Sequence, residues 1–402
     1  MLHLVNKNVK QIELSGIRKV FNKVLNDPSI VNLTVGQPDF PTPQNVIKAG
    51  IKSLEEERTG YTTNSGLPDL RKAIAGFVDR RYGLKYEPEN EILVTIGASE
   101  ALDIAFRTIL DEGSEVILPV PIYPAYEPLI RLCGAIPVFI DTRETGFKLN
   151  AEMIKTKLTD KTRCVLLPYP SNPCGSILEK EELQEIADLL RDKEIFIISD
   201  EIYSELTYGT RHHSIASFPE MKEKSIVING LSKSHAMTGW RIGFALAPTY
   251  LIEEMLKIHV YNTVCATSTS QYAALEALSA DLIEVEQMKE EYQKRRDYVF
   301  DRVKSMGLDV SWPDGAFYLF PSIKNTGMSS EEFNEKLIEQ AKVAVIPGSA
   351  FSTYGEGYIR ISYASSMENL VEGLNRLEKF LGIIKNSFSG KMESVSAAEH
   401  MS

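Results

Sequence analysis

The sequence contains few cysteines and no excess of positive charge. Its four cysteines (Cys133, Cys164, Cys174 and Cys265) form no C-x-x-C pair. They therefore indicate neither a zinc site nor a disulfide framework, and they fit a reducing compartment such as the cytoplasm. Lys and Arg number 44 against 55 Asp and Glu, which makes the formal net charge −11. We do not expect a nucleic-acid-binding protein, because phosphate backbones require a basic surface.

Long apolar runs are also missing. The N-terminal stretch MLHLVNKNVKQIELS lacks the apolar segment of about 7–15 residues that marks a signal peptide. No run approaches the ~20 residues that span a bilayer. The six histidines show no metal-ligand spacing, and the P-loop, G-x-G-x-x-G and G-x-S-x-G motifs are absent. We therefore expect a cytoplasmic protein without a membrane segment or a metal site.

The chain does have the length and composition of an ordinary globular protein. It has 402 residues, of which 43% are hydrophobic and 25% charged, and roughly 100–200 residues per domain suggest two or three domains. Apolar runs of strand length lie at 92–96, 115–118, 136–140, 163–167, 195–199, 225–228 and 242–247. Helical patterns lie near 43–57, 68–82, 99–111, 122–133, 179–191 and 250–259. This alternation predicts an α/β fold with a doubly wound, mainly parallel seven-stranded sheet.

The pattern changes after residue 283. A charged helix is expected over about 283–306, followed by strands at 316–323, 343–346 and 358–364 and by helices near 330–341 and 366–382. Strands with few helices predict a smaller α+β domain. The predicted organisation is an N-terminal helix (about 10–26) and loop in 1–44, a large domain in 45–283, a small domain in 284–385 and a tail in 386–402. The tail is rich in Ser, Ala and Glu, and we expect it to fray.

Several expected strands are followed by side chains that can bind a ligand. In a doubly wound sheet, ligands bind at the carboxyl ends of the strands. The residues Gly97-Ala98-Ser99-Glu100 open a helix after the first run; free N–H groups there can hold a phosphate, although an ordinary serine N-cap explains them as well. Tyr123 and Tyr126 lie between prolines. A rigid aromatic there can stack on a flat ligand or simply pack in a turn.

Two further strand ends carry polar side chains. Asn172 lies in a proline-braced turn, where its amide can reach a ligand or serve turn chemistry alone. Asp200 ends the run at 195–199, and a carboxylate at the end of a buried strand needs a partner. That partner is either the start of the next helix or, in a cofactor site, a protonated pyridine nitrogen.

Residues 229–243 read NGLSKSHAMTGWRIG and centre on Lys233. Lysine forms Schiff bases with carbonyl cofactors, and the alternative is a solvated surface lysine. Arg241, eight residues further on, can make a bidentate contact with phosphate. Together, the strand ends offer a phosphate site, an aromatic ring, an amide, a carboxylate and a lysine with an arginine. This set predicts a pocket for a planar, phosphorylated aldehyde with a cationic ring, namely pyridoxal 5′-phosphate.

Over roughly residues 5–385, the chain resembles the class I/II aminotransferases of the fold-type I pyridoxal-phosphate enzymes. The stretch around Lys233 is the most specific match, and SNPCG and ISDEIYSEL occur in the order that the family shows. Within the family, the chain is most similar to bacterial N-acetyl-L,L-diaminopimelate or aromatic-type aminotransferases. The segments that carry this likeness are SGIRKVFN, LTVGQPDF, GYTTNSGLPDLR, GLSKSHAMTGWRIG and PGSAFSTYGEGYIRIS.

The resemblance implies a role for each matched residue. Lys233 would form the Schiff base and then move a proton at the substrate's Cα, and Asp200 would pair with the pyridine nitrogen. The remaining implied cofactor contacts are Ala98, Ser99, Glu100, Tyr123, Asn172, Tyr203, Ser232, Arg241 and the partner subunit's Tyr61. Tyr203, with Lys233 and Asp200, is in the implied catalytic set. The implied substrate contacts are Gly36, Asn172, Ile17 and Arg360, which would grip the α-carboxylate.

The implied activity is amino transfer between an amino acid and a 2-oxo acid by a ping-pong mechanism, in a homodimer with shared active sites. N-acetyl-L,L-diaminopimelate with 2-oxoglutarate is the implied pair, and an aromatic amino acid is the alternative donor. A β-lyase on the same fold, or a non-enzymatic module of the kind fused to regulators, are other interpretations. Many relatives place a phosphate-binding serine three residues before the lysine, where this sequence has Gly230, so Ser232 would have to substitute.

Overall fold

The computed structural model describes residues 1–399 except 15, 18–19 and 21–26, and it gives only the backbone of 386–399. The chain divides into two compact units. The first comprises Met1–Glu13, Gln37–Glu291 and Pro313–Ala316, and the second comprises Leu14–Gly36, Tyr292–Trp312 and Phe317–Ser402. The domain boundaries predicted from the sequence stay a prediction. The expected helix over 10–26 lies largely outside the described residues.

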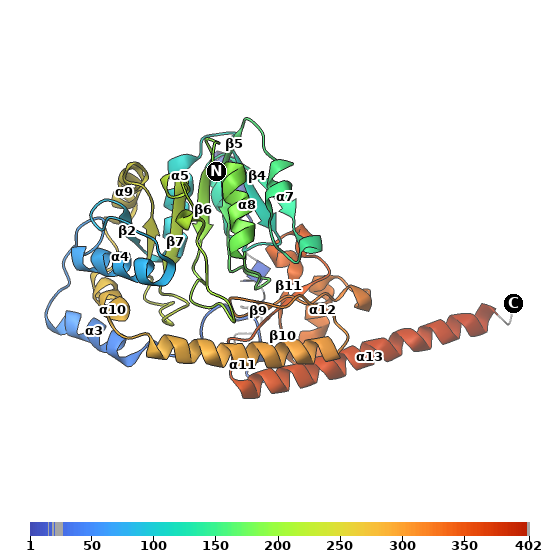
Figure 1. Cartoon of the computed structure of the whole chain (residues 1–402). Helices are drawn as coiled ribbons and strands as arrows, with labels where there is room; N and C mark the ends of the chain where they lie inside the picture. Colours follow the sequence, from blue (N-terminus) through green and yellow to red (C-terminus); the bar gives the residue numbers. More distant parts are fainter. Residues whose placement is uncertain (15, 18–19, 21–26, 400–402) are drawn as a thin grey trace. The chain divides into compact units, whose positions relative to one another are not determined.

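A seven-stranded sheet forms the centre of the first unit, as the sequence predicted (Figure 1). Its strands are β2 (Ile92–Thr95), β3 (Glu115–Val120), β4 (Ile136–Asp141), β5 (Thr162–Leu167), β6 (Phe196–Asp200), β7 (Ser225–Gly230) and β8 (Gly243–Leu246). They lie in the order β2-β8-β7-β6-β5-β3-β4, and β8 is antiparallel to both of its neighbours, whereas the other pairs are parallel. Six strands therefore end at the same edge, where β8 begins.

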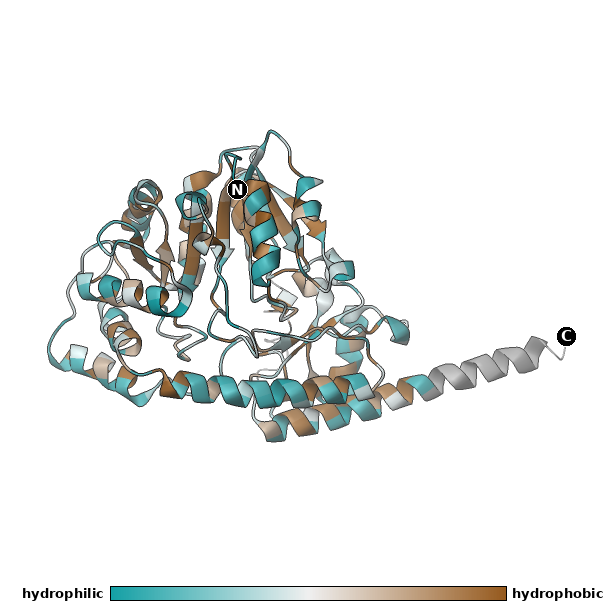
Figure 2. Ribbon diagram, viewed as in Figure 1, coloured by the Kyte–Doolittle hydropathy of each residue, from teal (hydrophilic) through white to brown (hydrophobic). Residues whose placement is uncertain are grey.

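Helices cover the sheet of the first unit, and the strands are accordingly apolar (Figure 2). β7 is buried at every position, as expected when both faces of a sheet are covered. Val227 packs in a cluster with side chains of the helices α4 and α10, and Ile197 packs in another with side chains of α8. The helices of this unit are α1 (Lys7–Lys10), α3 (Gln44–Glu55), α4 (Pro68–Tyr82), α5 (Gly97–Ile109), α6 (Tyr126–Leu132), α7 (Ala151–Lys155), α8 (Lys180–Leu190), α9 (Thr249–Thr263) and α10 (Ser268–Ser279).

Local signals mark several helix ends. α4 begins with Pro68 and is followed by Gly83 in the left-handed region at a φ of 71°, which is the usual placement of these two residue types. α8 begins with a capping box between Glu179 and Glu182. The sequence did not predict α7 or α10, because α7 is very short and α10 begins in a Ser/Thr-rich stretch that is typical of a loop.

The second unit contains two small sheets, in agreement with the predicted α+β pattern. β11 (Ile346–Pro347), β12 (Ile359–Ser362) and β9 (Tyr318–Leu319) form an antiparallel sheet, and β1 (Val31–Asn32) pairs in parallel with β10 (Val343–Ala344). α12 (Ser330–Lys336) continues through one π-helical turn (Leu337–Ala341), and α13 (Met367–Glu399) follows the last strand. The long helix α11 (Ile283–Ser305) contributes residues to both units.

α13 is longer than the sequence predicted. We expected the chain to fray from about residue 386, whereas the backbone of α13 is helical to Glu399. The segment contains no proline and includes alanine, glutamate, methionine and lysine, which have high helix propensity, and an existing helix extends at the cost of fixing one residue at a time. None of the described helices combines the length and the hydropathy needed to cross a bilayer.

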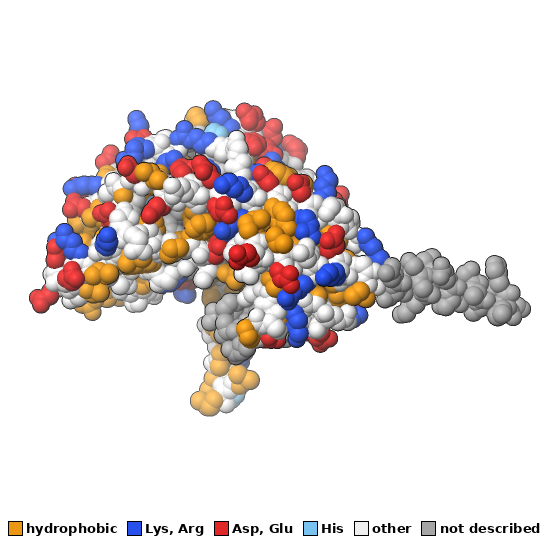
Figure 3. Space-filling view, turned by 90° about the horizontal axis from the view of Figure 1, so that it is seen from below, with side chains coloured by type: hydrophobic (Ala, Val, Ile, Leu, Met, Phe, Trp, Pro, Cys, Tyr) orange, Lys and Arg blue, Asp and Glu red, His pale blue; other side chains and the backbone are white. Residues whose placement is uncertain are grey.

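Charged side chains of both signs are interspersed on the face shown in Figure 3. Apolar side chains lie between them in small groups. Such a mixture produces no extended field of one sign over this face.

Candidate active site

Most of the candidate site residues of the first unit come at or just after the ends of strands. They therefore lie at the edge of the sheet where six strands end and β8 begins. Gly243, the first residue of β8, pairs with Thr95 of β2 and with Gly230 of β7. Because β8 is antiparallel to both neighbours, Arg241 just before it lies near the ends of β2 and β7. In open α/β sheets this edge is where ligands bind.

The start of α5 packs closely against Arg241 and β8. Gly97 has a φ of 76°, and a Cβ atom on it would lie only 2.7 Å from Nη2 of Arg241. A Cβ atom on Gly243 would lie 2.7 Å from the backbone nitrogen of Ala98. The first N–H groups of a helix have no partner within the helix and attract anions. Since Arg241 and Ser99 are exposed, this corner has the charge and the hydrogen-bond donors that suit a phosphate.

Gly230 is explained by the same close packing. A Cβ atom at this position would lie 2.9 Å from Cα of Gly243 and 3.0 Å from the carbonyl oxygen of Ile242, which is closer than carbon atoms approach in practice. The position therefore has no room for a serine side chain. The expectation that Ser232 substitutes for it stays a prediction; that side chain is buried.

The segment around Lys233 is held in place by side-chain contacts. The indole Nε1 of Trp240 donates to the hydroxyl of Thr42 at 3.0 Å, and that hydroxyl donates to the carbonyl of Ala236 at 2.8 Å. Lys233 itself is half-buried, and its Nζ lies 5.7 Å from the centre of the Tyr203 ring. The structure therefore does not support the interpretation of Lys233 as a freely solvated lysine.

Asp200 is a buried carboxylate at the end of β6. The hydroxyl of Tyr126 donates to its Oδ2 at 2.8 Å, and the backbone N–H of Ile202 donates to its Oδ1 at 3.2 Å. Burial raises the pKa of Asp200 to about 6, and the negative charge of Glu201 acts in the same direction. The two hydrogen bonds and the positive charge of Lys233 oppose this rise of the pKa. At neutral pH, Asp200 is therefore ionised and able to pair with a cation.

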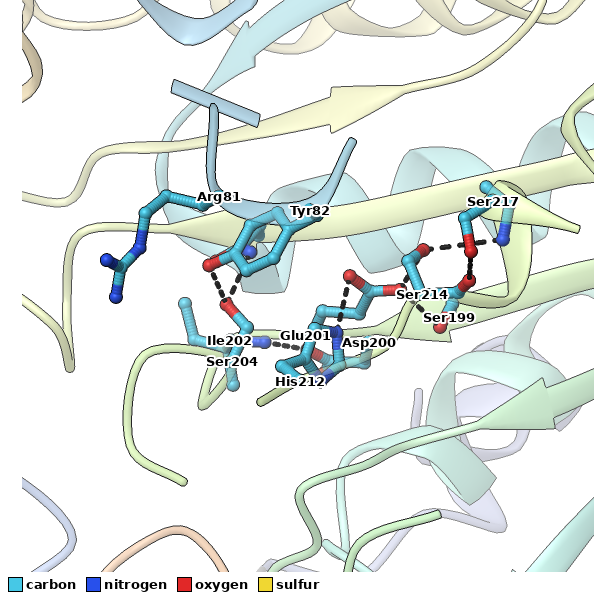
Figure 4. Close-up of polar contacts among 12 residues, drawn as sticks. Arg81, Tyr82, Ser199, Asp200, Glu201, Ile202, Ser204, His212, Ser214 and Ser217 are labelled. Atoms are coloured by element: carbon cyan, nitrogen blue, oxygen red, sulfur yellow. Dashed lines mark hydrogen bonds and ion pairs between the residues drawn. The ribbon is translucent and has the colours of Figure 1, made fainter. Parts of the chain in front are cut away.

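Glu201, next to Asp200, lies in a network of buried polar side chains (Figure 4). Its Oε1 accepts from Ser199 at 2.9 Å and from Ser214 at 2.6 Å, and its Oε2 lies 2.9 Å from Nε2 of His212. Both carboxylate oxygens are thus satisfied, as a fully buried carboxylate requires. One of these bonds joins the side chains of Ser199 and Glu201, the two residues that flank Asp200 in the chain.

Tyr126 contacts the candidate site, although the sequence analysis assigned it no role there. It was noted only as a stiff aromatic, but it donates a hydrogen bond to Asp200 and contacts Tyr123 edge to face, with ring centres 5.6 Å apart. Spacing alone did not reveal the first contact, because the two residues are separated by 74 positions in the chain. Tyr126 therefore links the candidate ring-stacking tyrosine to the candidate partner of a ring nitrogen.

Three other expected cofactor residues have distinct surroundings. Asn172 is half-buried, in a turn closed by the hydrogen bond from Ser171 N to the Ser176 carbonyl at 2.9 Å. Tyr61 is 84% exposed. The carboxylate of Glu100 has protein partners, since it accepts a hydrogen bond from the backbone N–H of Ile96 and lies against His259; its expected contact with the cofactor stays a prediction.

The expected substrate contacts Arg360, Gly36 and Ile17 belong to the second unit. Arg360 is 1% exposed, and its guanidinium carbon lies 4.3 Å from the ring centre of Tyr318 and 5.1 Å from that of Phe351. A guanidinium between aromatic rings keeps its planar N–H edge in one orientation. A Cβ atom at Gly36 would lie 3.1 Å from the Tyr318 hydroxyl, so a larger residue would disturb this arrangement. Ile17 is half-buried.

Comparison with known proteins identifies the family. The model of the family "Aminotransferase class I and II" matches residues 28–377. This chain belongs to the class I and II aminotransferases. It is therefore a pyridoxal-phosphate-dependent enzyme that acts on amino acids and 2-oxo acids. The predicted fold class, enzyme class and cofactor are confirmed.

The most similar relatives differ in their substrates. A probable N-acetyl-LL-diaminopimelate aminotransferase of Bacillus subtilis is 54% identical over 381 residues, which cover 95% of this chain and 96% of that protein. An aspartate aminotransferase of Pyrococcus abyssi is 43% identical, covering 91% of this chain and 95% of that protein. The crystal structure of an aromatic aminotransferase from Pyrococcus horikoshii OT3 has a TM-score of 0.87 and 41% identity, covering 91% of this chain and 99% of that one.

The residues of the first unit fit pyridoxal phosphate. The start of α5 and Arg241 suit its phosphate, and the half-buried Lys233 suits its aldehyde. Asp200 is buried and ionised at neutral pH because its pKa is about 6, which suits a protonated ring nitrogen. These groups come from strand ends far apart in the sequence.

Replacing Gly230 by serine should destabilise the protein. The new Cβ would lie 2.9 Å from Cα of Gly243, and overpacking of this kind lowers the free energy of unfolding by about 1–3 kcal/mol. Thermal or urea unfolding of Gly230→Ser measures the effect. Gly239→Ser is the matched control, because a Cβ atom there meets nothing within 4 Å. Equal stability of the two variants would contradict the packing argument.

Replacing Tyr126 by phenylalanine should raise the pKa of Asp200. The lost hydrogen bond stabilises the ionised carboxylate and lowers its pKa, so in the variant Asp200 takes up its proton at a higher pH. The affinity of the apoprotein for pyridoxal phosphate should consequently begin to fall at a higher pH as the solution is acidified. Titrations of both apoproteins with the cofactor across pH 5–8 (roughly the range around such a shifted pKa) measure this.

Tyr86→Phe is the control for that titration. The Tyr86 hydroxyl is buried but has no hydrogen-bond partner among the described residues, so its removal should leave the pH dependence unchanged. A profile of Tyr126→Phe that coincides with the wild-type profile would show that Tyr126 does not control the ionisation of Asp200.

Proposed function

We propose that the enzyme transfers the amino group of N-acetyl-L,L-diaminopimelate to 2-oxoglutarate by a ping-pong mechanism. The observation that carries the proposal is the 54% identity to the Bacillus subtilis protein of that probable activity, which extends over 95% of this chain. An aromatic amino acid is the alternative donor. It is supported by the similarity to the Pyrococcus horikoshii aromatic aminotransferase.

When bound, pyridoxal phosphate supplies an aldehyde and an electron-withdrawing ring. The Nζ of Lys233 would take the proton from the α-carbon of the amino acid and deliver it to C4′, the aldehyde carbon of the cofactor, within the same half-reaction. Asp200, held in its ionised form by Tyr126 and Ile202, keeps the ring nitrogen positively charged. Tyr203 and Asn172 would hold the ring through its oxygen atom.

The remaining residues of the cofactor site would bind the cofactor without taking part in proton transfer. Tyr123 would stack on the face of the cofactor ring and help to hold it in place. Ala98, Ser99 and Arg241 would bind the phosphate, and Ser232 would take the place of the phosphate-binding serine that Gly230 replaces. With the phosphate anchored, the reacting carbon stays within reach of Lys233, and correct placement of reactants accounts for a large part of enzymatic rate enhancement.

Arg360 binds the α-carboxylate that amino acids and 2-oxo acids share. The Nη2 of Arg360 donates to the carbonyl oxygen of Thr34 at 2.7 Å, and Tyr318 and Phe351 fix the plane of the guanidinium. A planar fork suits a carboxylate better than the point charge of a lysine does. Gly36 leaves space beside Tyr318, and Ile17 lines the entrance for the substrate.

Arg360→Lys should therefore lower kcat/KM for both the amino donor and the 2-oxo acid. Loss of a charge-assisted hydrogen bond corresponds to roughly a tenfold to hundredfold decrease. Steady-state kinetics with each substrate measure it. Arg376→Lys is the control, because Arg376 pairs with Glu372 at the surface. A decrease confined to the amino donor would argue against recognition of the shared carboxylate.

We also propose a homodimer in which the partner subunit's Tyr61 completes each active site. The 84% exposure of Tyr61 is high for a tyrosine and is consistent with burial by a second copy. The N-terminal segment likewise exposes Leu2 and Leu4. A sedimenting species with the mass of one 45.0 kDa chain would refute the dimer. The spaced, unpaired cysteines support a cytoplasmic location, which cell fractionation tests.

Comparison of amino donors tests the proposed substrate. With 2-oxoglutarate as acceptor, kcat/KM for N-acetyl-L,L-diaminopimelate should exceed that for phenylalanine, tyrosine or aspartate by at least about tenfold, since a matched polar group discriminates strongly. A higher value for phenylalanine or tyrosine would favour the aromatic alternative. Pyruvate and ammonia released from a cysteine-like substrate without any 2-oxo acid would indicate a β-lyase.

A further inference from the structure

Glu100 lies in the first turn of α5, yet its carboxylate contacts another helix. Its Oε2 accepts a hydrogen bond from the backbone N–H of Ile96 at 2.5 Å, directly before Gly97. Its Oε1 lies 2.8 Å from Nδ1 of His259 and 3.3 Å from the hydroxyl of Thr263, both on α9. The side chain thus connects the turn that precedes α5 to the last turns of α9.

The Glu100–His259 pair is removed from solvent. The side chain of His259 is 0% exposed and that of Glu100 11%. Since a carboxylate accepts hydrogen bonds, Nδ1 of His259 carries the proton toward it. The other ring nitrogen, Nε2, is buried and has no hydrogen-bond partner among the described residues. An apolar pair of similar size would avoid the free-energy cost of burying these polar groups. The Glu100–His259 pair therefore points to a function other than stability.

The hydrogen bond between Ile96 and Glu100 determines which backbone N–H groups near the start of α5 remain free to bind a ligand. Glu100 accepts the hydrogen bond of the Ile96 N–H and so fixes the orientation of the peptide group between Thr95 and Ile96. Gly97 then turns the chain with its φ of 76°, and the N–H groups at the start of α5 stay available to an anion. A carboxylate this close to a bound phosphate would repel it if its charge were not directed toward His259 and the Ile96 N–H.

Thr263, which contacts Glu100 at the end of α9, lies beside a strained turn. Val264, which follows Thr263, has a φ of 65° and a ψ of −57°, and the N–H of Cys265 donates to the Thr263 carbonyl at 2.8 Å. This is a γ-turn of the rare hand, unfavourable for a β-branched residue. The carbonyl of Val264 accepts from Asn64 at 2.8 Å. Such strain persists only where surrounding contacts enforce it, so the end of α9 is a firm support for Glu100.

We propose that Glu100 and His259 are positioning residues that hold the first turn of α5 in the conformation that binds the cofactor's phosphate. Glu100 itself does not touch the cofactor in this arrangement. The proposal rests on the assignment of that turn as the phosphate site. It predicts that variants of Glu100 or His259 bind a ligand with a phosphate group more weakly than the wild type does, while their binding of a ligand without phosphate is nearly unchanged. A general loss of packing would weaken the binding of both ligands.

Pyridoxal phosphate and pyridoxal, which lacks the phosphate, provide the test. Apoproteins of the full chain are titrated with each ligand and followed by visible absorption. Glu100→Ala and His259→Phe should weaken binding of pyridoxal phosphate roughly tenfold to a hundredfold while leaving that of pyridoxal within about twofold. Glu100→Gln, which keeps an acceptor for the Ile96 N–H, should retain more of the affinity. Asp103→Ala is the control, because Asp103 lies on the same helix and pairs with Arg107 at the surface.

A second measurement needs no cofactor. Inorganic phosphate should raise the Tm of the wild-type apoprotein, and this rise should shrink in Glu100→Ala and Glu100→Gln. Equal losses of affinity for pyridoxal phosphate and pyridoxal, or an unchanged effect of inorganic phosphate on the Tm, would overturn the positioning role. If the wild-type protein itself bound pyridoxal as tightly as pyridoxal phosphate, the assignment of the phosphate site would fall, and the positioning role with it.

Discussion

Close contact between three backbone segments is the constraint on which the active-site edge depends. β7, β8 and the start of α5 approach so closely that a Cβ atom at Gly230 or at Gly243 would overlap the neighbouring backbone. This contact places the end of β7, which leads to Lys233, beside the helix start that suits a phosphate. Because protein interiors are close-packed, one added methyl group here would move both elements. The glycines therefore allow the end of β7, which leads to Lys233, to lie close to the start of α5.

Buried charges near this edge all have partners that define their direction. Asp200 is oriented by Tyr126 and by a backbone N–H, Glu201 by two serines and His212, and Glu100 by His259. A buried charge without such partners is strongly unfavourable. The hydrogen bonds therefore do more than offset desolvation, because they also fix where each carboxylate points. In the second unit, the aromatic rings of Tyr318 and Phe351 likewise orient the guanidinium of Arg360.

The sequence predicted the sheet well and the connections less well. Each of the seven strands was located to within a few residues, because buried parallel strands are short, continuous apolar runs. α10 was missed because its polar beginning is typical of a loop, and the end of α13 was placed too early because composition alone suggested fraying. α10 forms although its first residues favour irregular structure, because its buried side chains pack in the core of the first unit. α13 extends because its last residues include good helix formers and an existing helix lengthens by fixing one residue at a time.

The sequence by itself determined the fold class and the family, and it predicted the lysine, the carboxylate and the arginines of the site, because these follow from periodic patterns and from contiguous motifs. It did not reveal that Tyr126 holds Asp200, that Glu100 pairs with His259, or that Gly230 faces Gly243 across two strands. The first two contacts join residues 74 and 159 positions apart in the chain, and the third depends on the antiparallel pairing of β8 with β7. The pKa of Asp200 likewise depends on burial and neighbours, which are properties of the folded chain.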